Sequence, residues 1–303
     1  MAKEPARHSF IVELVIRLVK EKPLGTIGGV IVLILLLAGI FADFLAPYGM
    51  NAISLADRLA PPSAQHIMGT DNLGRDLFSR IIYGARISLY VGLGGSCLYT
   101  LIAVTIGVLS GFIGGRFDLV VQRFVDGFMC FPPLVLYLTI MALTGPGLVQ
   151  VILVLGTVAG ITGSRVVRSA VIGIKENVYV EAARAIGSSP GRMLIRHILP
   201  NIMAPIIILF TIHVGQFILA EATLSFLGFG IPPPTPSWGG MLSGAGRQFM
   251  YLAPWMALWP GLALALAVYG INMLGDALRD LLDPRLRGGV GRYGTAKAKT
   301  ARS

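Results

Sequence analysis

The sequence predicts an all-α integral membrane protein whose chain crosses the bilayer six times. Hydrophobic residues make up 54% of the 303 residues and charged residues only 13%, and the mean hydropathy is +0.75. A soluble chain would carry about a quarter charged residues. Six apolar runs approach or exceed the roughly 20 residues that a helix needs to span a bilayer. These runs are Leu24–Ala42, Ser88–Ile113, Leu119–Leu143, Leu148–Val166, Ile202–Phe229 and Ala253–Leu274.

The basic residues predict which side of the membrane each connection occupies, because Lys and Arg gather in cytoplasmic loops. Most of the 25 Lys and Arg lie near the termini, before the third run and around residues 165–196. The opposite side holds only Arg58, Arg75, Arg80, Arg86 and Arg247. Both termini are therefore expected in the cytoplasm. This bias and anionic lipid account for the net charge of +10, and nucleic-acid binding is disfavoured.

The same patterns divide the chain into three segments. Residues 1–23 are expected to be a cytoplasmic amphipathic segment, in which FIVELVIRLVKE lies as a helix on the leaflet or only extends the first span. Residues 24–287 form the six-helix membrane domain, with an external segment at 47–87 and a cytoplasmic loop at 167–201. Residues 288–303, rich in Gly, Ala, Lys and Arg, are expected to be a disordered basic tail.

Charged residues of alternating sign mark the external segment, in the stretch GTDNLGRDLFSR. Asp71, Arg75, Asp76 and Arg80 have helical spacing and are expected to form ion pairs along a short helix. They make either a gate or contact surface for an external partner, or a polar cap on the bundle. The later external loop IPPPTPSWGGML carries Trp238, which suits the membrane interface, and forms a gate edge or only a connection.

Two runs contain polar residues that could line a pathway. Ionisable groups are costly in a membrane, so Arg123 and Asp126 are expected to pair, with a transport site as the alternative. Phe131-Pro132-Pro133 predicts a kink one turn later. In the fifth run, His213 and Gln216 lie near one face, while Glu221 points elsewhere and is expected to hydrogen-bond a neighbouring helix. The candidate pathway or gate residues are Asp126, Pro132, His213, Gln216 and Glu221.

The polar stretch EAARAIGSSPGRMLIRHILPN, Glu181–Asn201, predicts two short helices around a turn. Gly187 tolerates positive φ and suits the C′ position that ends the first helix. Ser189 and Pro190 suit the N-cap and first position of the second. Pro200 is expected to prevent simple continuation into the fifth run. One apolar stripe on the second helix predicts a docking element, formed by Met193, Leu194, His197 and Ile198.

Motifs of catalysis are absent from the sequence. It contains no GxxxxGK[ST] phosphate loop, no GxSxG elbow and no clustered metal ligands, so no catalytic, cofactor-binding or metal-binding residue is predicted. Six helices with a docking loop and no ATP-binding motif favour the membrane part of a multi-subunit transporter. An autonomous proton-coupled carrier or channel would need several ionisable groups at midplane depth, where only His213 lies. A membrane enzyme would need a catalytic cluster.

The stretch Glu181–Asn201 resembles the EAA loop of bacterial ABC importer permeases, whose pattern is E-A-A, a Gly four residues later and then I-x-L-P. The matching residues here are Glu181, Ala182, Ala183, Gly187, Ile198, Leu199 and Pro200, with the spacing I-L-P. Other fragments resemble the dipeptide, oligopeptide and nickel branch, in order along nearly the whole chain. They are KPLG, LAPY, GTDNLGRD, SRIIYGARISL, ILAEATLSFLGFG, PPTPSWGGML and LRDLLDPRLR. The chain resembles the C-type permease of this branch.

This resemblance implies the type I ABC importer permease fold, in a bacterial inner membrane. The implied partners are a B-type permease that completes a heterodimer, two cytoplasmic ATPase subunits that bind ATP, and an extracytoplasmic binding protein. The EAA loop, with Ser189 and Pro190, would couple to the ATPase, and Glu181 would orient the loop or contact a basic group there. The binding protein would meet Asp71, Arg75, Asp76 and Trp238. Dipeptides or oligopeptides are the expected substrates, while nickel chelates and glutathione stay open.

Overall fold

The apolar runs fold into long helices. The computed structural model describes residues 10–282, so the predicted tail lies outside the described residues. Within that range, five helical stretches are long and apolar enough to cross a bilayer, and a bent pair supplies a sixth if it is taken as one span. The range contains one isolated bridge, Thr70–Asp76, and no strand. The prediction of an all-α multi-pass fold is confirmed.

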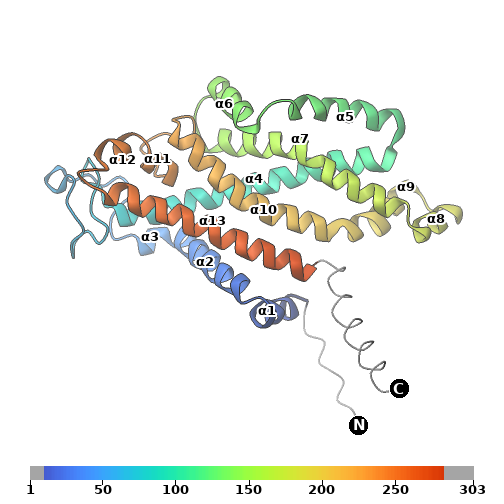
Figure 1. Cartoon of the computed structure of the whole chain (residues 1–303), viewed down its shortest axis with the longest axis horizontal. Helices are drawn as coiled ribbons and strands as arrows, with labels where there is room; N and C mark the ends of the chain where they lie inside the picture. Colours follow the sequence, from blue (N-terminus) through green and yellow to red (C-terminus); the bar gives the residue numbers. More distant parts are fainter. Residues whose placement is uncertain (1–9, 283–303) are drawn as a thin grey trace, which may run out of the picture.

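The long helices lie side by side along one axis, with a group of short elements at each end (Figure 1). The long ones are α2 (Pro23–Ile40), α4 (Leu77–Ile113), α7 (Leu148–Lys175), α10 (Leu199–Phe226) and α13 (Trp255–Leu282). At one end lie α3 (Ala42–Leu45), η1 (Leu55–Asp57), α11 (Trp238–Leu242) and α12 (Gly244–Phe249). We call residues 46–76 and 227–254, at this end, the cap. The other end, which we call the coupling end, carries α8 (Val178–Ala185) and α9 (Pro190–Met193).

The N-terminal segment forms α1 (Phe10–Glu21), a helix separate from α2. Pro23 stands at the start of α2, where its missing N–H costs no hydrogen bond. α1 contacts both α2 and α13.

Glycines let the helix backbones approach each other directly. The most extensive helix pair is α4 with α7. A Cβ atom on Gly107 of α4 would lie 2.5 Å from the carbonyl oxygen of Ser164 on α7. A Cβ on Gly28 of α2 would lie 2.6 Å from the carbonyl oxygen of Gly270 on α13. Small residues of this kind allow close packing between membrane helices, where apolar lipid gives little hydrophobic driving force.

The main apolar core lies among α4, α7 and α10. Tyr99, Leu155, Ile198 and Phe217 are buried in it. A second cluster joins α2, α4, α10 and α13 and includes the buried indole of Trp238. Buried apolar clusters therefore extend from Ile198 at the coupling end to Trp238 in the cap.

Among the helices that extend beyond the apolar runs that predicted them, α4 and α7 have identifiable causes. α4 begins at Leu77, because the Asp76 carboxylate accepts a hydrogen bond from the backbone N–H of Ser79 (2.8 Å) and caps the helix. α7 continues to Lys175, because its charged turns pair with α5. The connections at the two ends are therefore shorter than the predicted ranges 47–87 and 167–201.

The third apolar run is two helices and not one kinked helix. α5 (Gly115–Met129) and α6 (Pro133–Thr144) meet at 85°. Pro132 occupies the N-cap position of α6 and Pro133 its first position. Because two consecutive prolines remove two backbone donors, the predicted bend becomes a complete break.

Pro200 does not end the second helix of the coupling end, contrary to the sequence expectation. α9, the π-helical turn η2 (Leu194–Ile198) and α10 follow one another without interruption from Pro190 to Phe226. The N–H of Leu199 donates to the carbonyl of Leu194, five residues earlier. A proline ring clashes with the carbonyl four residues before it, and the wider π turn accommodates this clash.

Gly107 provides a test of the α4–α7 contact. In Gly107→Ala the added methyl group must push α7 away, and we expect a loss of about 1–3 kcal/mol in stability. The matched control is Gly127→Ala on α5, where a Cβ meets no atom within 4 Å. Melting curves of the detergent-solubilised chain should show a lower midpoint only for Gly107→Ala. Equal midpoints would contradict the close-contact interpretation.

Candidate functional site

In the cap, Asp71 is the centre of a hydrogen-bonded turn. Its Oδ1 accepts from the backbone N–H groups of Leu73 (2.8 Å) and Arg75 (3.0 Å). Its Oδ2 accepts from Arg75 Nε at 2.6 Å, and Arg80 Nε lies 3.9 Å from the same oxygen. The predicted ion pairs are therefore present. They do not lie along one helix, because α4 begins only at Leu77 and Asp71 stands in the preceding loop.

Asp76 is held by a second polar group in the cap. His66 Nδ1 lies 3.0 Å from Asp76 Oδ1, and the Ser79 hydroxyl donates to Asp76 Oδ2 (2.7 Å). The hydroxyl of Ser79 also accepts from the backbone N–H of Tyr48 (3.1 Å). This network ties residues 48–66 to the start of α4.

Trp238 joins the other part of the cap to the helices. Its indole Nε1 donates to the carbonyl of Ile81 (3.1 Å), and the ring packs on Gly84, where a Cβ would lie 2.7 Å from Nε1. Asp71, Asp76 and Trp238 are all buried. Their observed contacts hold the shape of the cap, so a partner that binds there would meet their exposed neighbours.

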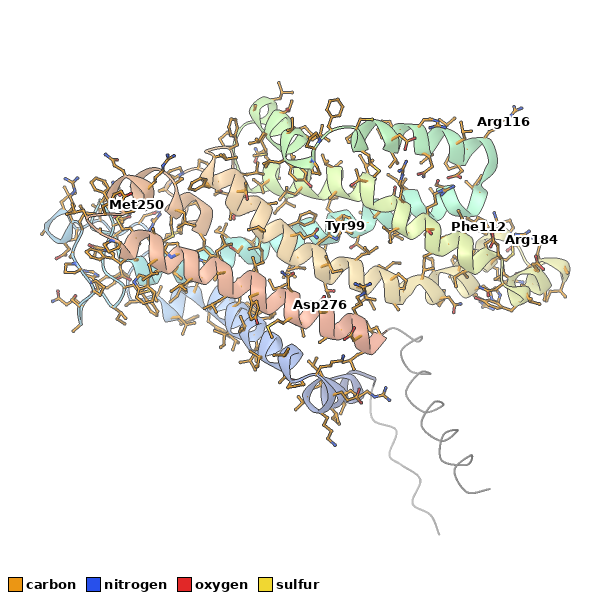
Figure 2. All side chains as sticks on the ribbon, in the orientation of Figure 1. Tyr99, Phe112, Arg116, Arg184, Met250 and Asp276 are labelled. Atoms are coloured by element: carbon orange, nitrogen blue, oxygen red, sulfur yellow. The ribbon has the colours of Figure 1, made fainter. Side chains whose placement is uncertain are left out.

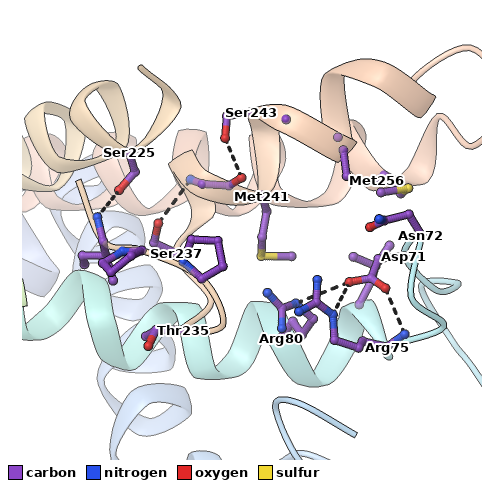
Figure 3. A pocket seen from close by; sticks show the side chains of 18 of the residues that line it. Asp71, Asn72, Arg75, Arg80, Ser225, Thr235, Ser237, Met241, Ser243 and Met256 are labelled. Carbon is purple, nitrogen blue, oxygen red and sulfur yellow. Dashed lines mark hydrogen bonds and ion pairs between the residues drawn. The ribbon is translucent and has the colours of Figure 1, made fainter. Parts of the chain in front are cut away.

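A cavity of about 280 Å³ lies inside the cap. Figure 3 shows Asp71, Arg75 and Arg80 at one side of it and Ser225 and Ser237 at the other. We call this space the cap cavity. The first turns of α4, the loop after α10, and α11 and α12 form its wall.

A row of polar contacts joins α5 to α7. Arg168 binds Asp118 with two nitrogens, Nε to Oδ1 at 2.6 Å and Nη2 to Oδ2 at 2.5 Å. Arg165 contacts Asp126 and also donates from Nε to Gln122 Oε1 (3.2 Å). The predicted pair of Arg123 and Asp126 is present at 3.0 Å. Asp126 therefore belongs to a structural ion-pair row.

The polar residues of α10 do not form one site. His213 stacks on Tyr99 of α4 with ring centroids 3.6 Å apart, and its Nδ1 donates to the Leu209 carbonyl (2.8 Å). Gln216 is exposed on the surface of the chain. Glu221 is fully buried and accepts from the Ser225 hydroxyl (2.6 Å) of its own helix. It also interacts with the side chain of Ser237, the N-cap residue of the neighbouring α11.

The coupling end contains the predicted glycine turn. Gly187 has φ of +82°. Its N–H donates to the Arg184 carbonyl and the N–H of Ser188 to the Ala183 carbonyl, both at 3.0 Å. These two bonds define a Schellman motif, which ends α8 and reverses the chain. Ser189 and Pro190 occupy the predicted N-cap and first positions of α9, but the Ser189 side chain makes no capping bond.

Half of the apolar stripe predicted to dock is buried within the chain, since Met193 and Ile198 are buried whereas Leu194 and His197 are partly exposed. Ile198 has no exposed surface and belongs to the main core, and Met193 is 5% exposed. The apolar surface that faces outward comes from other residues. These are Val178, Tyr179, Ile186 and Ile195, with Ile186 86% exposed. The sequence alone could not tell the buried face of this segment from its outward face, since apolar residues occur on both.

Glu181 lies at the rim of a second cavity, of about 290 Å³, behind α8. Asp118, Lys175 and Arg184 line the same cavity. Glu181 is exposed, and its side chain makes no hydrogen bond within residues 10–282. Its predicted role, to orient the loop or to contact a basic group on the ATPase, stays a prediction. Figure 2 places Arg184 at the coupling end, Met250 at the cap and Tyr99 between them.

Sequence reasoning missed the residues that pair with α5. Asp118, Gln122 and Asp126 are spaced four apart, which places all three on one face of a helix, and Arg165 and Arg168 are one turn apart. These two spacings together could have predicted from the sequence that the two helices pair through charged side chains. Residues 10–282 contain no group of three or more His, Cys, Asp or Glu that could hold a metal ion.

Two family models match the chain. The model described as a binding-protein-dependent transport system inner membrane component matches residues 103–288. The model described as the N-terminal TM domain of oligopeptide transport permease C matches residues 11–62.

Curated relatives match most of the chain. A putative peptide transport system permease protein of Brucella suis is 42% identical over 86% of this chain and 88% of its own length. The dipeptide transport system permease protein DppC of Alkalihalophilus pseudofirmus is 40% identical over 94% of this chain and 92% of its own. The oligopeptide transport system permease protein OppC of Bacillus subtilis is 37% identical over 88% of each chain.

A solved structure shares the fold. A chain of the inward-facing MetNI methionine ABC transporter aligns with a TM-score of 0.56 at 20% identity, over 67% of this chain and 96% of its own. The family model that covers more than half of the sequence, together with relatives near 40% identity over most of its length, establishes the family. The chain belongs to the binding-protein-dependent transport system inner membrane components, which are transport proteins and not enzymes.

Proposed function

We propose that this chain is a permease subunit of an ATP-driven importer for dipeptides or oligopeptides, and that it forms half of the translocation pathway. A B-type permease would supply the other half, two cytoplasmic ATPase subunits the energy, and an extracytoplasmic binding protein the substrate. The printed descriptions of the relatives support a peptide substrate. Glutathione permeases are also among them, at 39% identity, so glutathione is the second candidate substrate.

The observation that carries the coupling role is the outward apolar surface of α8 and η2 beside a tight glycine turn. Apolar side chains exposed on a polar, non-membrane connection are typical of a protein contact. The buried face of the same segment packs on α7 and α10, so a partner that moves α8 also moves the bundle. Of the residues with the EAA pattern, Glu181, Ala182 and Pro200 are exposed for contact, while Ala183 and Ile198 are buried and anchor the segment.

The cap would meet the binding protein on the other side of the membrane, with its shape held by Asp71, Arg75, Asp76 and Trp238. Both termini and the coupling end would lie in the cytoplasm. Of the candidate pathway residues, Gln216 is exposed on a spanning helix. An exposed amide is costly against lipid, so we place this face of α10 against the second permease or the water-filled pathway.

Ile186 tests the docking surface. Ile186→Glu should reduce copurification of the ATPase subunits from detergent-solubilised membranes about tenfold or more, because it places an unpaired charge at the contact. Ile67→Glu is the matched control, since Ile67 is 60% exposed but lies in the cap. Retention of the ATPase by Ile186→Glu would contradict the assignment. A wild-type chain isolated as a homo-oligomer without an ATPase would favour the autonomous carrier or channel.

Gly187 tests the turn. In Gly187→Ala, a side chain must adopt positive φ at a cost of about 1–2 kcal/mol, so we expect α8 to reorient and peptide uptake to fall. Gly191→Ala adds the same methyl group on α9, where it meets no atom within 4 Å and needs no unusual φ. The measurement compares uptake of a labelled peptide by cells that contain equal amounts of the Gly187→Ala and Gly191→Ala variants. Equal uptake would show that the turn geometry is dispensable.

The orientation can be measured with single cysteines in a Cys97→Ala/Cys130→Ala background, without the ATPase subunits. Ser63 is exposed in the cap and Ala185 at the coupling end. A membrane-impermeant maleimide should label the Ser63→Cys variant in intact spheroplasts and the Ala185→Cys variant only after permeabilisation. The reverse pattern would place the termini outside the cell.

A further inference from the structure

We propose that the cap cavity binds a carboxylate group, and that this group is the C-terminal carboxylate of a small peptide. The inference rests on the proposed function and deepens it, because it names the part of the substrate that the cap recognises.

The wall of the cap cavity carries one uncompensated positive charge. Its charged residues are Asp71, Arg75 and Arg80. Asp71 accepts from Arg75 Nε at 2.6 Å, whereas Arg80 Nε approaches the same carboxylate only to 3.9 Å. A single carboxylate is therefore shared by two guanidinium groups. A buried cation is costly unless it is paired, and a second anion in the cavity would complete the pairing.

Both arginines keep donors free for such an anion. Arg80 donates from Nη1 to the carbonyl of Met50 (2.8 Å), but no hydrogen bond within residues 10–282 uses its Nη2. Arg75 uses Nε alone, and its two η nitrogens make no hydrogen bond in the same range. The side chains are 7% and 14% exposed. Guanidinium groups present paired N–H donors that match the two oxygens of a carboxylate.

The rest of the wall suits a small solute with variable side chains. Met241 and Met256 contribute flexible thioethers, which adapt to different apolar groups. The volume of about 280 Å³ is close to the lower limit of ligand cavities, about 300 Å³, so only a small solute would fit. The arginines would thus hold the group common to all peptides with a free C-terminus, and the methionines would tolerate what differs among them.

An acidic side chain of the binding protein could present the same carboxylate. We favour the peptide because Arg80 is almost completely enclosed by the chain. A carboxylate on the surface of a folded partner would have to enter this enclosed space, whereas a small peptide can enter whole.

Tryptophan fluorescence can report binding in the full chain reconstituted in lipid nanodiscs. The chain has three tryptophans. Trp238 donates to the Ile81 carbonyl beside the cavity, and Trp255 donates to the Thr70 carbonyl in the cap. The probes are dialanine with a free C-terminus and dialanine amide. We expect a saturable change with the free acid and none with the amide. Equal binding of the two, or equal displacement by chloride, would overturn the assignment.

Two variants should shift the affinity in opposite directions. Arg75→Gln removes a donor pair and should weaken binding of the free acid about tenfold or more. Asp71→Asn removes the competing charge but keeps an Oδ1 acceptor for the turn, so it should tighten binding. Arg247→Gln is the control, because Arg247 is exposed on α12 and does not line the cavity. An Asp71→Asn variant that melts like the wild type but binds no more tightly would overturn the proposal.

The complete complex separates this proposal from the proposed function. One outcome is that the complex imports dialanine while the isolated permease binds the free acid and the amide equally. This outcome would refute the site and leave the importer intact. A clear distinction between acid and amide without ATP-dependent import would support the site and refute the importer. If the isolated chain ignores dialanine but Arg75→Gln weakens stimulation by the binding protein, the carboxylate belongs to that protein and the peptide assignment fails.

Discussion

The close approach of α4 and α7 is the contact on which the rest of the structure depends. At Gly107 the two backbones come so near that no side chain fits between them. Because lipid offers little hydrophobic drive for helix association, close contact of this kind is what holds membrane helices together. The pair provides the surface that α10 covers, and it places Arg165 and Arg168 where they can bind α5. The ion-pair row and the main core are both consequences of one close-packed pair.

Charge serves two different purposes in this molecule. On α5 and α7, each carboxylate has an arginine partner, and the pairs fasten a helix that is broken from its continuation at Pro132. In the wall of the cap cavity, Arg75 and Arg80 share Asp71. Satisfied pairs make a fixed support, whereas an excess of cations leaves a demand for an anion. The α5–α7 contacts are therefore fully paired, whereas the wall of the cap cavity keeps the excess positive charge on which the proposed carboxylate site rests.

The sequence predicted five of the six helical spans, because each needs a long apolar run and little else, whereas the third run is broken into α5 and α6. It also predicted the turn at Gly187, since few residues other than glycine accept its φ. It failed where the outcome depends on tertiary packing. Pro200 indicates a helix end by local rules, but the π turn before it absorbs the clash. Ile198 belongs to a stripe with the pattern of a docking face, and only the fold shows that Ile198 itself is buried in the main core.

The continuous helix from Pro190 to Phe226 has a mechanical consequence. Its 37 residues extend about 55 Å at 1.5 Å per residue. One end adjoins the Gly187 turn, and the other carries Ser225 in the wall of the cap cavity. No loop interrupts this helix between its two ends. Its π-helical turn, η2, lies near the coupling end. Under the proposed function, a tilt imposed at the coupling end would act as a lever, and its far tip would move Ser225 in the wall of the cap cavity.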